Sequence, residues 1–392
     1  MNTKKIQNLL NALHLDAWLI YQNQGTYEIG LNTLANDVCG IKDLVTRPWF
    51  CQIKRSGPPT WIYQSMEQDK FVHFLGKKLV YGSRDDLVRV LKQALPQSGR
   101  IAMEISSDAN IPALSRVDYG TITLLKKLTR ATIVSSQNLV GTYLSIWGKS
   151  GYQSHLKARN KLIKILNLTT AYLKHNLGKV TDLQLQKHIE ELYVKQSLIT
   201  LYHPVVASGK NTGNPHYFPS ASKPVPIQKN ELLLIDIWGK TKDHNSVFAD
   251  VTTMFYTGRH VPDQIQSSWK TLKLARDTAL NSIIKSLKAG HIPTGSNIDD
   301  AARAVVSKAG LKNYFVHRTG HNISTELHGF GPNLDNYETK DTRQLVLDSG
   351  YSIEPGIYTP YYGLRSEINI YISPDKKVIV TTPQPTEIQK II

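Results

Sequence analysis

The sequence predicts an α+β protein with two domains. Its 392 residues exceed what a single hydrophobic core usually supports. Residues 1 to about 145 alternate helical and strand patterns, which is typical of an α/β domain. From 151 to 392 the patterns run in the order helices, strands, helices, strands, which indicates an antiparallel sheet covered by helices on one face. We therefore expect domains at 1–145 and 151–392.

The first domain combines one sheet with short helices. A helix is expected near 3–13, and Ser83 with two early acids predicts a second helix that ends before Pro96. This part of the chain contains no dense group of potential metal ligands, so we expect a structural, gating or oligomerisation role. The predicted strands are 16–21, 49–53, 60–63, 79–81, 100–105 and 131–134.

The second domain begins after a predicted linker, Ser145–Gly151. A long helix at about 153–176 follows, and Thr181 with Gln184 forms a capping box that starts the next helix. The later predictions are strands at 203–208 and 231–258, the second a hairpin that turns within 240–246, helices at about 262–289 and 296–309, and a strand-rich end.

The composition indicates a globular protein, with 41% hydrophobic and 20% charged residues. No stretch approaches the roughly eighteen apolar residues of a membrane-spanning helix, so we expect no membrane association. The amphipathic start of the chain is too broken by polar residues to serve as a signal peptide. Cys39 and Cys51 are expected to be free thiols, which favours a cytoplasmic location.

The net charge of +16 raises the possibility of a nucleic-acid partner. The lysines are scattered singly or in pairs, however, and no nucleic-acid-binding motif is present. We therefore predict a solvated basic surface without nucleic-acid binding. The same positive field would attract small anionic substrates.

Two aspartates occupy strand patterns where an unpaired charge is costly. Asp236 ends an apolar run, where a lone acid is more often a turn or cap residue. Asp250 lies within the apolar run 247–255, fourteen residues further on. If the two runs pair as a hairpin, this even separation allows both acids on one sheet face. Two adjacent carboxylates repel each other unless a proton or a cation compensates them.

Histidines and glutamates gather near the end of the chain. His317, His321 and His328 fall within twelve positions, beside several glycines and after the strand-like residues 314–316. Glu354 and Glu367 lie in strand-like sequence. A lone histidine here would more often be structural, and each acid has an ordinary explanation when taken separately. Taken together, the four acids and His321 indicate two divalent metal ions.

These residues carry a family resemblance. The set Asp236, Asp250, His321, Glu354 and Glu367, with the runs Ser352-Ile-Glu-Pro-Gly-Ile-Tyr358 and Arg365-Ser-Glu367, resembles the creatinase/aminopeptidase P metallopeptidases. The resemblance extends over nearly the whole chain and is strongest to Xaa-Pro aminopeptidases and prolidases. It implies a pita-bread catalytic domain at 151–392 and a creatinase-type α/β domain before it.

The resemblance also implies roles for the ligands. Asp236 would chelate one metal ion, His321 and Glu354 would hold the other, and Asp250 and Glu367 would bridge both. Manganese is favoured over zinc or cobalt, because oxygen-rich ligation suits harder ions. The implied reaction is hydrolysis of Xaa-Pro bonds by a metal-bridging hydroxide, with Glu354 as the proton shuttle.

Other residues match pocket positions of the family. His216 and His328 would face the substrate, and His317 would lie near the residue after the cleaved bond. Tyr358 and Arg365 would orient the bridging acids. The expected partners are a proline-containing peptide substrate and, by resemblance alone, a second copy of the chain in a homodimer.

The sequence also departs from the family pattern. The interval between the two aspartates is longer than usual, and Thr253, Arg318 and Ser324 replace residues common at their positions. Trp238 and Arg318 occur together in one branch of the family, which leaves substrate choice open. Two alternatives remain: a metal-independent, creatinase-type hydrolase of non-peptide C–N bonds, and an inactive pita-bread module that binds peptides or proteins. The intact ligand set disfavours both.

Overall fold

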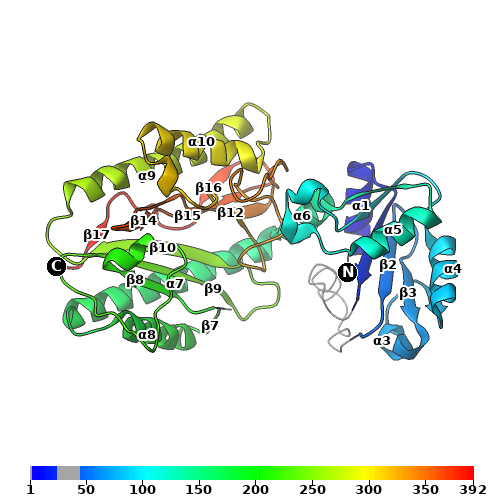
Figure 1. Cartoon of the computed structure of the whole chain (residues 1–392), viewed down its shortest axis with the longest axis horizontal. Helices are drawn as coiled ribbons and strands as arrows, with labels where there is room; N and C mark the ends of the chain where they lie inside the picture. Colours follow the sequence, from blue (N-terminus) through cyan, green and yellow to red (C-terminus); the bar gives the residue numbers. More distant parts are fainter. Residues whose placement is uncertain (1, 24–44, 201) are drawn as a thin grey trace. The chain divides into compact units, whose positions relative to one another are not determined.

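A computed structural model describes residues 2–23, 45–200 and 202–392 of the chain (Figure 1). The chain divides into two compact units, Met1–Leu144 and Ser145–Ile392. No helix in the described ranges combines the length and the apolar character needed to cross a membrane.

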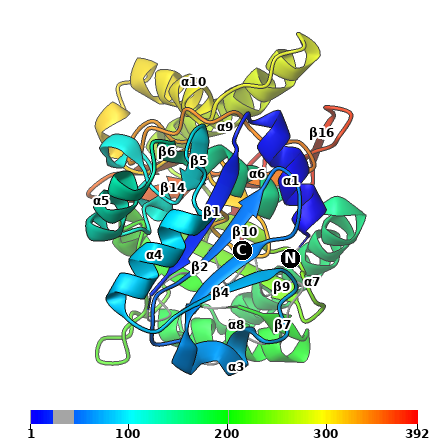
Figure 2. The ribbon, with the colours of Figure 1, turned by 90° about the vertical axis from the view of Figure 1, so that its right-hand side faces the viewer.

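The first unit contains a six-stranded mixed sheet with the strand order β4-β3-β2-β1-β5-β6 (Figure 2). Strand β2 pairs antiparallel with β1 and β3, and the other neighbours pair in parallel. All six predicted strands are present. They are β1 (Ala17–Gln22), β2 (Trp49–Lys54), β3 (Thr60–Gln64), β4 (Lys77–Tyr81), β5 (Arg100–Met103) and β6 (Thr132–Ser135).

Helices cover this sheet on both faces. Helices α4 and α5 pack on one face, while α1 and α3 contact β2 and β3. The Ser83 side chain accepts a hydrogen bond from the Asp86 N–H, as the predicted cap requires. Cys51 is a buried free thiol, whereas Cys39 lies outside the described residues. The helices are α1 (Thr3–Ala12), α3 (Gln68–Phe71), α4 (Arg84–Ala94), α5 (Tyr119–Leu128) and α6 (Gln137–Ser145). Of these, α3, α5 and α6 were not predicted.

The second unit contains three small sheets. Strands β17, β10, β9 and β7 form one sheet in that order, and β8 also pairs with β9. A second sheet has the order β11-β12-β15-β16, and β13 pairs with β14. The strands are β7 (Leu198–Ile199), β8 (Val205–Ser208), β9 (Leu232–Thr241), β10 (Ala249–Tyr256), β11 (Asn322–Ile323), β12 (Ser349–Ile353), β13 (Gly356–Tyr358), β14 (Gly363–Arg365), β15 (Ile368–Ile372), β16 (Val378–Val380) and β17 (Gln389–Lys390).

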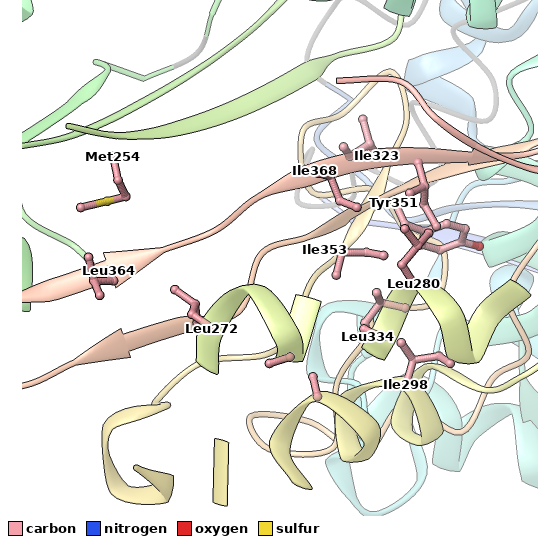
Figure 3. Close-up of a cluster of buried hydrophobic side chains, with 14 of the residues drawn as sticks. Met254, Leu272, Leu280, Ile298, Ile323, Leu334, Tyr351, Ile353, Leu364 and Ile368 are labelled. Atoms are coloured by element: carbon pink, nitrogen blue, oxygen red, sulfur yellow. The ribbon is translucent and has the colours of Figure 1, made fainter. Parts of the chain in front are cut away.

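Two hydrophobic clusters enclose these sheets. One joins α7 and α8 to β8, β9 and β10. The other joins α9 and α10 to the opposite side of β9 and β10 and to β12, β14 and β15 (Figure 3). The expectation of a sheet covered on one face was therefore wrong. Both faces of the hairpin carry apolar side chains, so helices pack on both. The helices are α7 (Gly148–Asn176), α8 (Asp182–Lys195), α9 (Asp263–Lys288) and α10 (Gly295–Lys308).

The predicted hairpin formed by β9 and β10 is present. Successive side chains of each strand point to opposite faces of the sheet, which determines the direction in which the acids point. Leu233, Ile235 and Ile237 pack toward α7 and α8. Leu234 and Trp238 pack toward the other cluster. Asp236 has the same parity as this second group, so it points into the space between the layers.

The predicted linker Ser145–Gly151 is mostly helical, because α6 ends at Ser145 and α7 begins at Gly148. The side chain of Trp147 explains the difference. Its indole N–H donates to the Ile323 carbonyl at 2.7 Å, and its ring stacks on Tyr371. Burial of this residue overrides the local preference of a Gly- and Ser-rich segment. The predicted strand at 314–316 was also wrong, because a 3-10 turn spans Lys312–Tyr314.

Buried His155 predicts a pH dependence of stability. Its Nδ1 donates to the Phe248 carbonyl at 2.6 Å, and its Nε2 lies 2.7 Å from the Thr381 hydroxyl. Burial lowers the pKa of His155 to about 4. Its neutral form therefore stabilises the fold above the unfolded-state pKa of about 6.5, and that contribution is lost as the pH falls toward 4.

We expect urea denaturation of the metal-free protein to record this loss. Between pH 6.5 and 4 the free energy of unfolding should fall by about 3 kcal/mol more in the wild type than in a His155→Gln variant. Parallel pH profiles for the two proteins would contradict the assignment.

Candidate metal centre and substrate pocket

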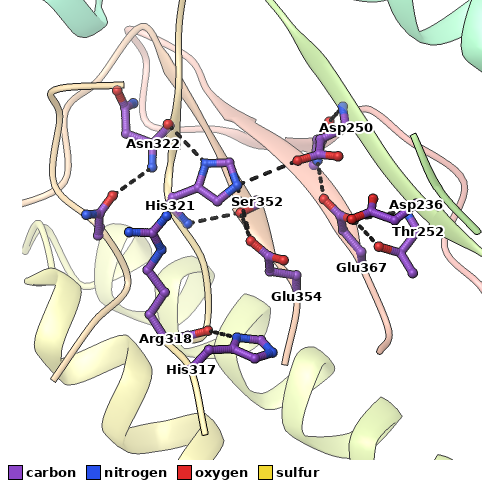
Figure 4. A network of polar contacts seen from close by, with 12 residues as sticks. Asp236, Asp250, Thr252, His317, Arg318, His321, Asn322, Ser352, Glu354 and Glu367 are labelled. Carbon is purple, nitrogen blue, oxygen red and sulfur yellow. Dashed lines mark hydrogen bonds and ion pairs between the residues drawn. The ribbon is translucent and has the colours of Figure 1, made fainter. Parts of the chain in front are cut away.

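Three carboxylates meet between the layers of the second unit. Asp236 lies on β9, Asp250 lies on β10, and Glu367 lies between β14 and β15. One carboxylate oxygen from each of them lies within 4.8 Å of the other two (Figure 4). In the hairpin register Asp236 is opposite Thr252, so the two aspartates are diagonal neighbours on one sheet face. The even spacing in the sequence predicted this arrangement.

Two oxygens of this cluster have no hydrogen-bond partner. Asp236 Oδ1 and Asp250 Oδ1 are buried and unpaired within the described structure. An unpaired buried carboxylate oxygen costs the full desolvation free energy of that group. The cluster therefore has open acceptor positions that suit a cation.

A histidine and a fourth acid extend the cluster. His321 Nε2 lies 3.1 Å from Glu354 Oε1 and 3.6 Å from Asp250 Oδ2. Asp250 thus approaches both the other carboxylates and the His321–Glu354 pair. The predicted ligands therefore form two adjacent groups that share Asp250.

The backbone around His321 is held closely against β12. A Cβ atom added at Gly320 would lie 2.1 Å from the Ser352 carbonyl oxygen, so only glycine permits this approach. The Glu354 N–H donates to the Thr319 carbonyl at 2.7 Å, and the Ser352 hydroxyl donates to Glu354 Oε1 at 3.0 Å. The two segments are thereby fixed together with His321 beside Glu354.

Arg365 and Thr252 orient the acids. The Arg365 guanidinium donates to Asp236 Oδ2 and, at 2.9 Å, to the Thr252 hydroxyl. That hydroxyl donates to Glu367 Oε2 at 2.7 Å, and the Thr252 N–H donates to the same oxygen at 2.9 Å. One cation thus positions two acids, in the role expected of Arg365. Sequence reasoning missed Thr252, although it lies two residues after Asp250 on the same strand face.

The charges of the cluster perturb one another. Burial and the nearby Asp236 and Glu354 raise the pKa of Asp250 well above its ordinary value. Burial and the charges of Asp250 and Glu354 do the same to the pKa of Glu367. Burial opposes ionisation of Glu354, yet the contact with His321 and the charges of His321, Arg365 and His317 together outweigh it, so the pKa of Glu354 is lowered. Without a cation beside them, Asp250 and Glu367 therefore resist ionisation, because a negative charge on either is unfavourable next to the other acids.

A cavity of about 240 Å³ opens onto these residues. It is lined by Asp236, Asp250, His321, Glu354 and Arg365 and by all three of the predicted pocket histidines, His216, His317 and His328. The His328 ring meets the His321 ring edge to face, with 4.5 Å between the ring centroids. The structure thus brings the predicted histidines together on the wall of one pocket.

Tyr358 contacts the pocket through His317. Its hydroxyl lies 2.9 Å from His317 Nε2, and His317 Nδ1 donates to the Arg318 carbonyl at 2.7 Å. Burial lowers the pKa of His317 to about 4 and raises the pKa of Tyr358 to about 12. Both side chains are therefore neutral near pH 7, and Tyr358 fixes the orientation of the imidazole.

An ion pair on α10 holds the histidine-bearing segment. Asp299 Oδ2 lies 2.6 Å from Arg303 Nε, and Asp299 Oδ1 accepts from the Thr319 N–H at 3.0 Å. The Arg303 guanidinium donates to the carbonyls of Phe315 and His317. Sequence reasoning missed this pair, because only the folded chain brings it to the segment 315–319.

The donor set fits divalent cations. Four carboxylates and one imidazole suit ions that prefer oxygen ligands, and two of the carboxylate oxygens are unpaired. The net negative charge of the cluster would be offset by two such ions. Asp236, Asp250 and Glu367 would surround one position, and His321, Glu354 and Asp250 would flank the other.

The fold and the site define an α+β protein with a carboxylate-rich candidate metal centre beneath a histidine-lined pocket. Residues 155–374 match the model of metallopeptidase family M24. The chain therefore belongs to family M24, and the predicted family resemblance is confirmed.

Curated relatives carry related names. The chain is 28% identical over 237 residues to a putative Xaa-Pro aminopeptidase of Mycoplasma genitalium, which covers 59% of this chain and 62% of that protein. It is 33% identical over 171 residues to an Xaa-Pro dipeptidase of Lactobacillus delbrueckii subsp. lactis, which covers 43% of this chain and 41% of that protein. The matches thus span about three fifths or less of these relatives.

Solved structures share the fold over nearly the whole chain. A dipeptidase from Pyrococcus horikoshii OT3 has a TM-score of 0.67 and 21% identity, with 100% of both chains covered. A dipeptidase from Mycobacterium ulcerans has a TM-score of 0.73 and 19% identity, with 99% of this chain and 96% of that chain covered. The predicted pita-bread fold with an amino-terminal domain is therefore confirmed.

The carboxylate cluster predicts opposite effects of one substitution with and without metal. We expect Asp250→Asn to raise the unfolding free energy of the metal-free protein by about 1–2 kcal/mol, because it removes like-charge repulsion. The same variant should lose most of the increase in Tm that Mn²⁺ produces in the wild type. Thermal denaturation with and without Mn²⁺ measures both effects.

Glu387→Gln is the matched control, because it neutralises an exposed acid away from the cluster. It should leave both the metal-free stability and the Mn²⁺ response at wild-type values. A metal-free Asp250→Asn protein that is less stable than the wild type would contradict the account of repulsion.

Proposed function

We propose that this chain is a metallopeptidase that hydrolyses Xaa-Pro bonds, either in dipeptides or at the amino terminus of longer peptides. One observation carries the proposal: two groups of predicted ligands share Asp250 and open onto a pocket that is also lined by His216, His317 and His328. Membership of family M24 supports the same activity. The names of the curated relatives support the preference for proline.

The proposed cofactor is a pair of divalent ions, with manganese favoured by the oxygen-rich ligands. Asp236, Asp250 and Glu367 would hold one ion, and His321 with Glu354 would complete the second position. Paired ions of this kind lower the pKa of water and polarise the carbonyl group of a substrate.

Glu354 is the proposed proton carrier. Its carboxylate lines the pocket and is ionised, because the surrounding charges, including that of Arg365, lower its pKa despite burial. Oε1 of Glu354 is already bonded to Ser352, which orients the side chain. As water attacks the scissile carbonyl carbon, Glu354 would accept one proton from the water. It would pass that proton to the proline nitrogen as the C–N bond breaks, which releases a carboxylate and a secondary amine.

The pocket histidines would bind the substrate. His216 and His328 line the cavity and can donate hydrogen bonds to the oxygen on which negative charge develops. His317 is neutral, and its proton is held at Nδ1 by the Arg318 carbonyl. It is therefore oriented before the substrate binds.

The proline preference has a physical basis. The nitrogen of an Xaa-Pro bond carries no hydrogen, so peptidases that align their substrates as β-strands lose a hydrogen bond there. A site that acts on the carbonyl group and protonates the departing nitrogen does not depend on that donor. We therefore expect the metal-loaded protein to cleave Ala-Pro or Ala-Pro-Ala and to leave Ala-Ala largely intact.

The assay compares these three peptides with protein reconstituted in Mn²⁺, with product release followed by chromatography. Cleavage of a proline peptide that stops on chelation supports the proposal. Absence of cleavage in protein with its metal confirmed by elemental analysis would refute it and favour a peptide-binding module.

Glu354→Gln tests the proton carrier and the ligand role together. We expect kcat to fall roughly 100- to 10,000-fold, because the amide cannot carry the proton. Manganese content should fall from two ions per chain to one, because an uncharged ligand replaces a carboxylate. Glu387→Gln, which neutralises an exposed acid, should retain both activity and metal. A Glu354→Gln protein with wild-type kcat would exclude the assigned role.

A further inference from the structure

Arg318 is a cation in the substrate pocket that the metal centre does not use. Its side chain is half-buried and lines the cavity, together with His317, His328 and Glu354. Its charge contributes to lowering the pKa of both His317 and His328, so it lies close enough to act on both imidazoles. An arginine keeps its positive charge at every physiological pH.

The guanidinium of Arg318 has no partner in the described parts of the chain. Its backbone N–H donates to Glu338 Oε1 at 2.8 Å, and its carbonyl accepts from His317 Nδ1. No hydrogen bond or ion pair to a described residue reaches the side chain, and Figure 4 draws a contact only at the carbonyl. Glu338 therefore holds the backbone of this residue and leaves its charge unpaired.

The other arginine of the pocket differs in this respect. The guanidinium of Arg365 is committed to Asp236 and Thr252. The Arg318 guanidinium can therefore donate two parallel N–H hydrogen bonds to the two oxygens of a carboxylate.

The backbone around Arg318 is held by side chains of helix α10. Before Arg318, Arg303 binds the carbonyls of Phe315 and His317; after it, Asp299 binds the N–H of Thr319. The Arg303 guanidinium also lies 4.1 Å from the centroids of the Phe315 and Tyr337 rings. The backbone of Arg318 is therefore fixed on both sides, while its side chain has no partner among the residues that the structure describes.

A second residue of the same cavity, Trp238, carries a donor without a partner in the described structure. Trp238 is buried, and its indole N–H has no hydrogen-bond partner in the described structure. A buried donor without a partner is costly. Of the two donors, the Arg318 guanidinium is the half-buried one that a ligand in the pocket can reach.

We propose that Arg318 forms an anion subsite of this pocket, which recognises a carboxylate carried by the substrate. This inference rests on the proposed peptidase function and deepens it. In an Xaa-Pro substrate that carboxylate has two sources: the free carboxyl terminus of a dipeptide, or an acidic side chain on the residue before proline. Recognition of the first makes the chain a dipeptidase, and recognition of the second makes it selective for acidic residues.

Two variants and a control test the subsite. Arg318→Met approximates the length of the side chain and removes its charge. Arg318→Lys keeps the charge and loses the paired N–H donors of the guanidinium. Lys340→Gln removes one positive charge from an exposed position of the same unit. All three should fold, because neither the Arg318 guanidinium nor the Lys340 side chain holds a structural contact, and their Tm values check this.

Three ligands separate the sources: Ala-Pro carries a terminal carboxylate, Ala-prolinamide carries none, and Asp-prolinamide carries a carboxylate only in its first side chain. We expect Arg318→Met to raise KM roughly 10- to 100-fold for the peptide whose carboxylate Arg318 binds, while KM for Ala-prolinamide stays unchanged. A selective rise for Ala-Pro identifies the carboxyl terminus, and a selective rise for Asp-prolinamide identifies the side chain. Arg318→Lys should restore part of the lost selectivity, which a purely structural role would not explain.

Equal KM values in wild type and Arg318→Met, or equal changes for all three ligands, would overturn the subsite. If the wild type cleaves none of them, the proposed function fails, and calorimetry with the same intact ligands still tests Arg318. Tighter binding of a carboxylate ligand than of Ala-prolinamide, lost in Arg318→Met and kept in Lys340→Gln, supports the subsite. Equal affinities in all proteins would exclude it.

Discussion

The repulsion between buried carboxylates is the constraint on which the rest of the second unit depends. Asp236, Asp250 and Glu367 approach within 4.8 Å, and two of their oxygens have no partner in the described parts of the chain. Such a cluster is costly unless cations neutralise it. The surrounding fold holds the acids together against this cost, through the hairpin register, the second sheet and the Arg365–Thr252 contacts. We interpret this arrangement as a centre organised in advance for metal.

The same scaffold connects the centre to the pocket. Gly320 allows the histidine-bearing segment to approach β12, so His321 lies beside Glu354. The Asp299–Arg303 pair fixes that segment from the opposite side, and with it His317 and Arg318. The ligand His321, the pocket histidine His317 and the proposed anion subsite at Arg318 therefore belong to one short stretch of chain that is held on both sides. A substitution in the Asp299–Arg303 pair would therefore alter the positions of all three residues.

Much of the site could be predicted from the sequence, because it depends on local periodicity. The even spacing of Asp236 and Asp250 in two apolar runs requires one sheet face once the hairpin forms. The segment before β11 was predicted as a strand and the segment around Trp147 as a linker, and both predictions were wrong, because tertiary contacts override local pattern. Other features depend on contacts between distant segments, which no local pattern encodes. They are the partners of Arg303 and, among the described residues, the lack of a partner for the side chains of Arg318 and Trp238.

The most direct test of the central claim is anomalous diffraction from crystals grown with Mn²⁺. The account predicts two manganese peaks in the second unit, one among Asp236, Asp250 and Glu367 and one beside His321 and Glu354, with Asp250 contacting both. A single peak, or peaks that do not contact Asp250, would contradict a centre built around shared carboxylates. An absence of manganese at saturating concentration would contradict the metal assignment altogether.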